Sequence, residues 1–323
     1  MSLRLGIDLG ATTTKLGLVN ERHRLVHRSS IPTQDDFGQA VEDITSAAHQ
    51  IVQEAGLGLS GLPFVGVGVP STVHPGTGRI VFANNTGWQN APLREALQDC
   101  LGVPILVAND ADCALSGEAA SGGAKGANNV LMLTLGTGVG GALLIEGQLY
   151  AGGDGMGMEL GHLPLIAGGR PCTCGAEGCL EAYVSATGLI ALTKEHMDRA
   201  PDSLMHQYAK DQGCAVTGET AFSCASHGDA AALHVIDQYA AWLAQGIGGL
   251  VNVFRPDIVL VGGGVSHAGK VLFDRLNAAL PRFILAYSII GGPPVRQALL
   301  GNDAGIIGAA FLDQVQDRRA QHV

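Results

Sequence analysis

Short apolar runs alternate with longer segments of helical spacing along most of the chain. The run Phe64–Val69 ends at Pro70 and is typical of a buried strand, whereas Ala230–Phe254 repeats its apolar residues as a long buried helix does. The same pattern predicts, in chain order, a helix over Phe37–Ala55, a short helix from about Pro92 to Cys100, a strand at residues 104–110, a helix that opens near Ala111, a strand over Asp257–Val261 and a last helix over about Ala304–Asp317. Strands that alternate with helices predict an α/β protein.

Two segments of the chain share one pattern. Leu5–Val19 reads LGIDLGATTTKLGLV, and Leu131–Ile145 reads LMLTLGTGVGGALLI. Each has an apolar run, a turn rich in Gly and Thr, and a second apolar run, which predicts a β-hairpin with a tight glycine turn. Two such hairpins, opening the two halves of the chain, suggest two lobes of similar fold. Two unrelated glycine hairpins are the alternative.

One connecting segment is unusually long. Residues 70–88 read PSTVHPGTGRIVFANNTGW and lie between a predicted strand and the predicted short helix near Pro92. Loops of this length in compact domains are uncommon and often functional. We therefore expect a binding loop here.

Composition and charge narrow the class of protein. Of the 323 residues, 46% are hydrophobic and 15% are charged, which allows a large core in two domains or in one two-lobed unit. The net charge is -10 and there is no basic run. This argues against nucleic acid and against an anionic membrane as partners, but not against nucleotides.

The sequence also indicates a compartment. Asp8 comes too early for the apolar core of a signal peptide, and the uncharged stretch Ala127–Ile145 contains a glycine turn, which predicts a hairpin rather than a membrane span. Three of the seven cysteines are clustered and the other four are scattered. This pattern fits a reducing cytoplasm better than a disulfide framework.

Three glycine turns follow predicted strands. They are Asp8-Leu9-Gly10-Ala11-Thr12 with Thr13 behind it, Gly136-Thr137-Gly138-Val139-Gly140-Gly141, and Gly262-Gly263-Gly264. Glycine lets main-chain N–H groups converge on an anion, and threonine adds a hydroxyl donor, so the three turns predict a phosphate-binding site. None matches the Walker pattern. Asp8 is a candidate Mg²⁺ ligand, with a turn-capping role as the alternative.

The pair Asn109-Asp110 ends a predicted strand and begins a predicted helix. A carboxylate at this place can accept the proton of a substrate hydroxyl during phosphoryl transfer. The alternative is that Asp110 is only the N-cap of the helix. Asp112, two residues on, is explained by the helix dipole.

A cluster of metal ligands lies between two glutamates. His162, Cys172, Cys174 and Cys179 offer one imidazole and three thiolates, which suits a closed, structural zinc site, with a redox thiol cluster or chance as alternatives. Zinc on one ring nitrogen of His162 would orient the other toward a substrate hydroxyl. Glu159 and Glu181 would be held nearby as hydroxyl acceptors, or else are ordinary surface residues.

These segments together resemble the ROK family (repressors, open reading frames and sugar kinases), within the actin-like ATPase superfamily, over essentially the whole chain. DLGATT and LGTGVGGA resemble its two phosphate motifs, ELGH its E-x-G-H sugar motif and CTCGAEGCLE its zinc motif. VHPGTGRIVFANNTGWQNAPL is similar to the sugar-binding loop of its glucokinases, with Asn85 at the asparagine position. NDAD is similar to the segment with the catalytic aspartate, which falls on Asp110.

The resemblance implies a two-lobed actin-like ATPase (ribonuclease H-like) fold. The small lobe would comprise residues 1–112 and about 301–323, and the large lobe residues 113–300. Closure of the lobes around a sugar would exclude water, which competes as a phosphoryl acceptor. The family also implies a homodimer.

The resemblance further implies ATP-dependent phosphorylation of the 6-hydroxyl of a hexose in carbohydrate metabolism (glycolysis), with glucose as the first candidate. Asp110 would be the catalytic base. The ring hydroxyls would be held by Asn85, Asn109, Glu159, His162 and Glu181. The first two glycine turns and Mg²⁺ would hold the ATP phosphates, and Gly262–Gly264 would lie by the adenosine.

Alternatives and departures remain at this point. Kinases of N-acetylmannosamine, N-acetylglucosamine, allose or fructose are alternatives within the family, and a sugar-sensing repressor or non-enzymatic sensor is an alternative of another class. A repressor would carry an N-terminal DNA-binding domain, and the first predicted strand starts by Leu3. Ala11 and Ala142 replace glycines that are usual in the phosphate motifs. Ser71 stands where glucokinases often have glycine, which bears on the choice of sugar.

Overall fold

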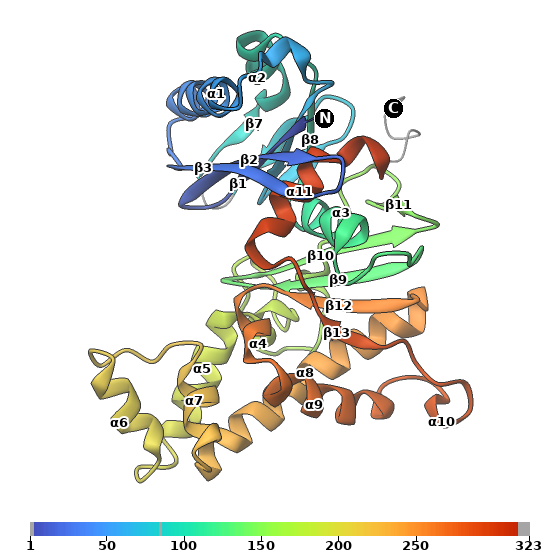
Figure 1. Ribbon diagram of the computed structural model, residues 1–323. Helices are drawn as coiled ribbons and strands as arrows, with labels where there is room; N and C mark the ends of the chain where they lie inside the picture. Colours follow the sequence, from blue (N-terminus) through green and yellow to red (C-terminus); the bar gives the residue numbers. More distant parts are fainter. Residues whose placement is uncertain (1–2, 84–85, 316–323) are drawn as a thin grey trace. The chain divides into compact units, whose positions relative to one another are not determined.

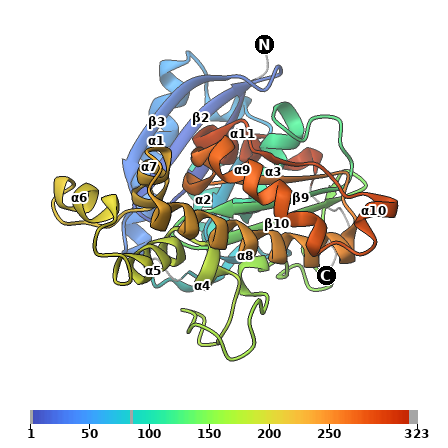
Figure 2. The same ribbon diagram turned by 90° about the horizontal axis from the view of Figure 1, so that it is seen from below.

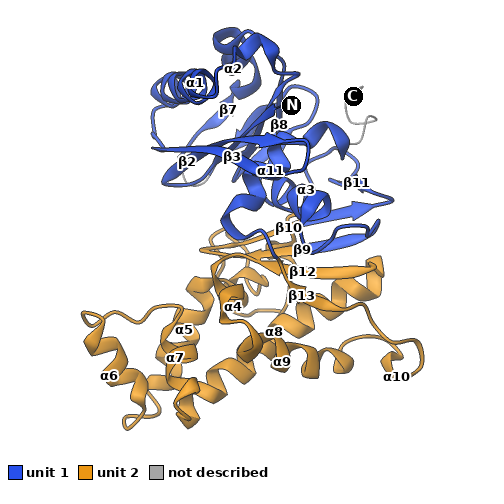
Figure 3. Cartoon of the chain, viewed as in Figure 1, with its two compact units in different colours: residues 1–132, 142–158, 299–323 blue, residues 133–141, 159–298 orange. Residues whose placement is uncertain are grey.

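The computed structural model describes residues 3–83 and 86–315 (Figure 1). The chain forms two compact units (Figure 3): unit 1 comprises residues 1–132, 142–158 and 299–323, and unit 2 comprises residues 133–141 and 159–298. From the sequence we expect the first part of the small lobe to end at residue 112. Helix α3 (Asp110–Ser121) and the segment that follows it to Met132 belong to unit 1.

A five-stranded sheet forms the centre of unit 1, in the order β3-β2-β1-β4-β8. Its strands are β1 (Leu3–Leu9), β2 (Thr13–Asn20), β3 (Leu25–Pro32), β4 (Val65–Val69) and β8 (Ile105–Asn109). β1 and β2 pair antiparallel, which confirms the first predicted hairpin. β1, β4 and β8 are parallel to one another, so these three strands end at the same edge of the sheet.

The two faces of this sheet carry different residue types. The other helices of unit 1 are α1 (Phe37–Glu54), α2 (Leu93–Leu101) and α11 (Ala304–Ala310). Leu5, Ile7 and Val67 are fully buried in a core that they share with α1 and α2. On the opposite face, a Cβ at Gly6 or Gly66 would come within 2.0 or 1.8 Å of main-chain oxygens of α11. Glycine therefore lets α11 pack directly on the strand backbone (Figure 1).

Residues 70–88 do not form one continuous loop, as was expected, and their role in binding stays a prediction. β5 (Thr72–His74), β6 (Arg79–Phe82) and β7 (Gln89–Ala91) form a three-stranded antiparallel sheet. Val73 pairs with Ile80, and both side chains are buried in the core of unit 1. Burial of this apolar cross-strand pair stabilises the small sheet. Asn85 lies outside the described residues.

A second five-stranded sheet has the order β11-β10-β9-β12-β13. Its strands are β9 (Val130–Leu135), β10 (Val139–Ile145), β11 (Gln148–Leu149), β12 (Ile258–Gly262) and β13 (Val295–Gln297). β9 and β10 are neighbours joined by the second glycine turn, as predicted. The division between the units runs through these two strands. Among the described helices, none combines the length and the apolar character that crossing a bilayer requires.

Unit 2 is otherwise helical, as expected after the cysteine cluster. Its helices are α4 (Glu181–Val184), α5 (Ala186–Met197), α6 (Leu204–Asp211), α7 (Thr220–Ser226), α8 (Ala230–Phe254), α9 (Lys270–Ala279) and α10 (Tyr287–Ile290). α8 has the predicted bounds and packs against α5, α7 and α9 (Figure 2). The buried Tyr239 hydroxyl in α8 donates to the Val184 carbonyl at 2.6 Å, which ties α8 to α4.

The last helix is shorter than predicted. α11 ends at Ala310, and a single 3-10 turn follows at Leu312–Gln314. Phe311 leaves the helical path and packs edge-on against the His23 ring, with the Arg4 guanidinium 4.7 Å from its ring centroid. These tertiary contacts override the helical pattern of the sequence. Residues 316 and 317 lie outside the described residues.

Replacement of Gly308 by alanine should destabilise unit 1. The new Cβ would lie 1.7 Å from the Cys113 carbonyl oxygen, so α3 and α11 must separate, and we expect a loss of about 2 kcal/mol in the free energy of unfolding. The matched control is Gly249→Ala in α8, where a Cβ meets no atom within 4 Å. Helix propensity should leave this control unchanged or stabilised by about 1 kcal/mol. Urea denaturation measures both, and equal midpoints for the two variants would contradict the packing described.

Candidate functional site

The first group of candidate residues lies at the carboxyl ends of the parallel strands of unit 1. Asp8 of β1 is paired with Gly68 of β4, and Val69 of β4 is paired with Asn109 of β8. In α/β sheets, ligands bind outside the carboxyl ends of the strands. The sheet therefore gathers the first glycine turn and the Asn109-Asp110 pair, which are about 100 residues apart in sequence, at one edge.

Asn109, and not Asp110, is the N-cap of α3. The Asn109 side-chain oxygen accepts the Ala111 N–H at 2.8 Å, and its Nδ2 donates to the Ser71 carbonyl at 3.3 Å. Asp110 is the first residue of the helix, and its Oδ1 also accepts the Ala111 N–H at 2.8 Å. The alternative that Asp110 is only the N-cap is therefore wrong. The cap fixes the start of the helix and so fixes where the Asp110 carboxylate stands.

Three carboxylates lie near the Cys113 thiol at this edge of the sheet. Burial raises the pKa of the Cys113 thiol, and nearby carboxylates raise it further, in the order Asp112, Asp8 and Asp110. Burial also raises the pKa of Asp8, partly offset by the Lys15 ammonium, which lies 4.0 Å from Oδ2. A half-buried carboxylate of this kind fits a cation at the glycine turn.

The first glycine turn has a defined conformation. Gly10 N–H donates to the Thr13 carbonyl at 3.1 Å, and the Thr33 hydroxyl donates to the Gly10 carbonyl at 2.8 Å. Thr33 N–H donates to the Thr12 carbonyl at 3.0 Å. Ala11 and Thr12 are exposed at the tip. Thr33 directly follows β3 and was not predicted as a site residue. Its two hydrogen bonds hold the turn in this conformation.

The second group of candidate residues lies in unit 2 and begins with two neighbouring turns. In the second glycine turn, Gly136 N–H donates to the Gly138 carbonyl at 3.0 Å, and Thr137 is exposed at the tip. In the third turn, Gly263 has φ +80, and a Cβ there would come 2.4 Å from the Leu135 carbonyl oxygen. The structure therefore brings Gly262–Gly264 beside the start of the second turn.

Glu181 contacts the second turn directly. Its Oε2 accepts the Val139 N–H at 2.8 Å, and its Oε1 lies 3.3 Å from the Thr173 hydroxyl. A Cβ at Gly138 would come within 2.4 Å of Oε2, so glycine is needed for the carboxylate to approach. The alternative of an ordinary surface glutamate is wrong for Glu181. This contact with the turn was not predicted.

The ELGH segment packs on β10. His162 N–H donates to the Glu159 carbonyl at 3.0 Å and closes the 3-10 turn Leu160–His162. Leu160 lies against Gly141, and a Cβ at Gly161 would come 2.2 Å from the Val139 carbonyl oxygen. The turn therefore holds Glu159 and His162 close to the strand that follows the second glycine turn.

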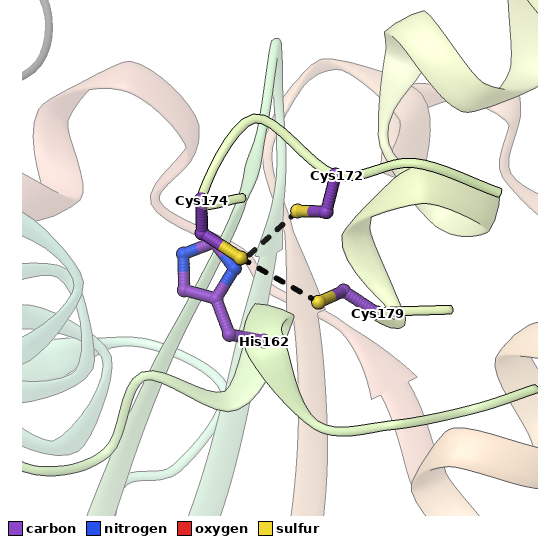
Figure 4. A group of neighbouring side chains, drawn as sticks. All are labelled: His162, Cys172, Cys174 and Cys179. Atoms are coloured by element: carbon purple, nitrogen blue, oxygen red, sulfur yellow. Dashed lines mark hydrogen bonds between the residues drawn. The ribbon is translucent and has the colours of Figure 1, made fainter. Parts of the chain in front are cut away.

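The four predicted metal ligands come together. One ligand atom from each of His162, Cys172, Cys174 and Cys179 lies within 4.8 Å of all the others. His162 Nδ1 is 3.7 Å from Cys172 Sγ, and Cys174 Sγ is 3.7 Å from Cys179 Sγ. Zn–S bonds of about 2.3 Å and a Zn–N bond of about 2.0 Å at tetrahedral angles require separations of about 3.5–3.8 Å. The cluster fits zinc, and the second ring nitrogen of His162 lies on the side away from the sulfurs (Figure 4).

Arg170 supports the cysteine cluster and was missed by the sequence analysis. Its guanidinium lies 5.1 Å from the ring centroids of both Tyr183 and Trp242 and pairs with Glu195. Its carbonyl accepts the Gly178 N–H at 2.8 Å. The cluster is thereby fixed to α4, α5 and α8. No local pattern marks such a residue, because the partners of its side chain named here are 13 to 72 positions away in the chain.

Comparisons with known proteins agree with this geometry. A glucokinase of Halalkalibacterium halodurans is 36% identical over 97% of this chain and 95% of its own length. An N-acetyl-D-glucosamine kinase of Aliivibrio salmonicida is 31% identical over 95% and 98%. A crystal structure of a ROK family glucokinase from Streptomyces griseus in complex with glucose and AMPPNP has a TM-score of 0.84 at 29% identity and covers 96% of this chain and 99% of that one. This similarity confirms the predicted α/β fold class.

The family model for the ROK family matches residues 4–316, which includes both groups of candidate residues. The predicted resemblance is thereby confirmed over nearly the whole length, and this chain belongs to the ROK family.

Proposed function

We propose that this protein transfers the terminal phosphoryl group of ATP to the 6-hydroxyl of a hexose, with glucose as the preferred substrate. The observation that carries the proposal is the Asn109-Asp110 pair at the carboxyl end of β8, level with the glycine turn that follows Asp8. A glucokinase at 36% identity supports the sugar, and the ROK glucokinase structure with AMPPNP supports ATP as the donor. The N-acetyl-D-glucosamine kinase at 31% identity supports an N-acetylated hexosamine as the alternative substrate.

Asp110 serves as the general base in this proposal. Its carboxylate accepts the proton of the 6-hydroxyl as that oxygen attacks the γ-phosphorus and the β–γ bridge oxygen leaves with ADP. Asn109 caps α3 and so holds Asp110 in place while it hydrogen-bonds the sugar. Asp8 would hold Mg²⁺, directly or through water, and the metal supplies charge neutralisation for the phosphates. The turns at Gly10–Thr13 and Gly136–Gly138 bind the phosphates, and Gly262–Gly264 lies by the adenosine.

The ring hydroxyls of the hexose are held by residues of the ELGH segment and its neighbours. Glu159 and Glu181 accept hydrogen bonds from hydroxyls, and Asn85 adds an amide. Because Nδ1 of His162 faces the sulfurs, metal on that atom would leave a proton on Nε2, which then donates to a sugar oxygen. Zinc in this closed site supplies structure and not an open coordination position.

The remaining parts of the proposal concern the compartment, the oligomeric state and the metabolic role of the protein. Three of the seven cysteines belong to the candidate metal cluster and the other four are scattered along the sequence, a pattern that supports a reducing cytoplasm. We further propose a homodimer, as the family resemblance implies, and a role at the entry of glucose into glycolysis.

An assay of ADP release with MgATP and a panel of hexoses tests the reaction. The unsubstituted protein should turn over glucose, and Asp110→Asn should lower kcat about 10²- to 10⁴-fold, because the general base is lost. Glucose binding, measured by calorimetry, should persist in the variant. Asp99→Asn, an exposed carboxylate in α2, is the matched control and should retain full activity. No release above background with any hexose would refute the proposed function, and full activity of Asp110→Asn would remove that residue from its role.

Cys174→Ser tests the metal site. Loss of one thiolate should reduce bound zinc from one ion per chain to near zero and lower the unfolding temperature by roughly 5 °C, since a site of this kind contributes folding energy. Glucose affinity should fall with it, because His162 and Glu181 lose their support. Cys214→Ser, also exposed and in unit 2, should keep its zinc. Elemental analysis that finds no zinc in the pure parent protein would end this part of the proposal.

A further inference from the structure

We propose that Thr187 is a positioning residue for the nucleotide phosphates: it holds the second glycine turn so that the N–H groups of Thr137 and Gly138 form a phosphate-binding pair. The inference rests on the proposed function and adds a residue to it. Thr187 lies outside every motif that the sequence indicated. It is the second residue of α5 and follows the last cysteine of the metal cluster by eight positions.

Three hydrogen bonds from residues 181–187 hold this turn. The Thr187 hydroxyl donates to the Thr137 carbonyl at 3.1 Å. Ala186 N–H donates to the Gly136 carbonyl at 2.8 Å, and Glu181 Oε2 accepts the Val139 N–H at 2.8 Å. We call these three contacts the turn clamp.

The direction of the two carbonyls decides what the turn presents. In a trans peptide the C=O and the N–H point in opposite directions, and the described peptide bonds are all trans. Because the Gly136 carbonyl points to Ala186, the N–H of Thr137 points away from α5. Because the Thr137 carbonyl points to Thr187, the N–H of Gly138 also points away from α5. Two successive N–H groups that face the same side form an anion-binding concavity.

The clamp itself is firmly anchored. Ser185 is the N-cap of α5, is 2% exposed, and its Oγ accepts the Gly188 N–H at 3.0 Å. This cap fixes the position of the Ala186 N–H. Glu181 is the first residue of α4 and Ser185 follows its last residue. The hydrogen bond from Tyr239 to the Val184 carbonyl holds α4 to α8. Thr187, by contrast, is exposed, so its side chain can be changed without disturbing the core.

Thr187→Val tests the inference, because valine has the shape of threonine and lacks the hydroxyl. The dissociation constant of AMPPNP with Mg²⁺, measured by calorimetry without sugar, should rise about threefold to tenfold, as expected for the loss of one neutral hydrogen bond. In turnover, the KM for ATP should rise by the same factor while the kcat at saturating ATP and the glucose affinity stay unchanged. Thr187→Ser, which keeps the hydroxyl, should restore the parent values.

Ser226→Ala is the matched control. Its hydroxyl also donates to a main-chain carbonyl, that of Ser223 at 2.6 Å, and Ser226 is an exposed residue at the end of α7 in the same unit. This variant should bind AMPPNP as the parent does. An unchanged AMPPNP affinity in Thr187→Val would overturn the inference, and so would equal losses of nucleotide and glucose affinity together with a lower unfolding temperature. If the parent protein binds no AMPPNP, the proposed function itself fails.

Discussion

Main-chain pairing of β4 with β1 on one side and β8 on the other determines where the reactive groups of unit 1 stand. The parallel register sets Asp8 beside Gly68 and Asn109 beside Val69, and a slip of one residue would turn every side chain of a strand to the other face. Two glycines of this sheet also determine which helix can pack on it. Gly6 and Gly66 leave room for α11, whose first turn lies against the Asp8 carboxylate at Gly305.

In unit 2 the corresponding constraint is the compactness of residues 159–187. Within these 29 positions the chain supplies four candidate metal ligands, two candidate hydroxyl acceptors and the clamp on the second glycine turn. Glu181 belongs to two of these groups, since it is a candidate hydroxyl acceptor and its carboxylate also accepts the Val139 N–H of the turn. In the proposed function, zinc in such a closed site would contribute to catalysis only through the positions of these residues.

The sequence predicted the features whose signals are local. The bounds of α8 follow from its own apolar spacing, the two hairpins follow from glycine turns between apolar runs, and the clustering of His162 with three cysteines follows from their type and spacing. The misses come from contacts that are distant in sequence. The small sheet around Val73 and Ile80 depends on the core below it, the early end of α11 depends on Phe311 packing near Arg4, and the clamp at Thr187 depends on a turn 50 residues earlier. The choice of N-cap at Asn109 rather than Asp110 depends on main-chain dihedral angles that the sequence does not specify.

The proposed catalysis depends on Asp110 as the base that deprotonates the 6-hydroxyl of a hexose. A crystal structure of the protein with glucose, Mg²⁺ and a non-hydrolysable ATP analogue tests it most directly. If Asp110 is the base, the sugar O6 should lie about 2.6–3.2 Å from an Asp110 carboxylate oxygen and in line with the γ-phosphorus. A bound glucose whose O6 is hydrogen-bonded elsewhere, with Asp110 contacting no sugar atom, would contradict it.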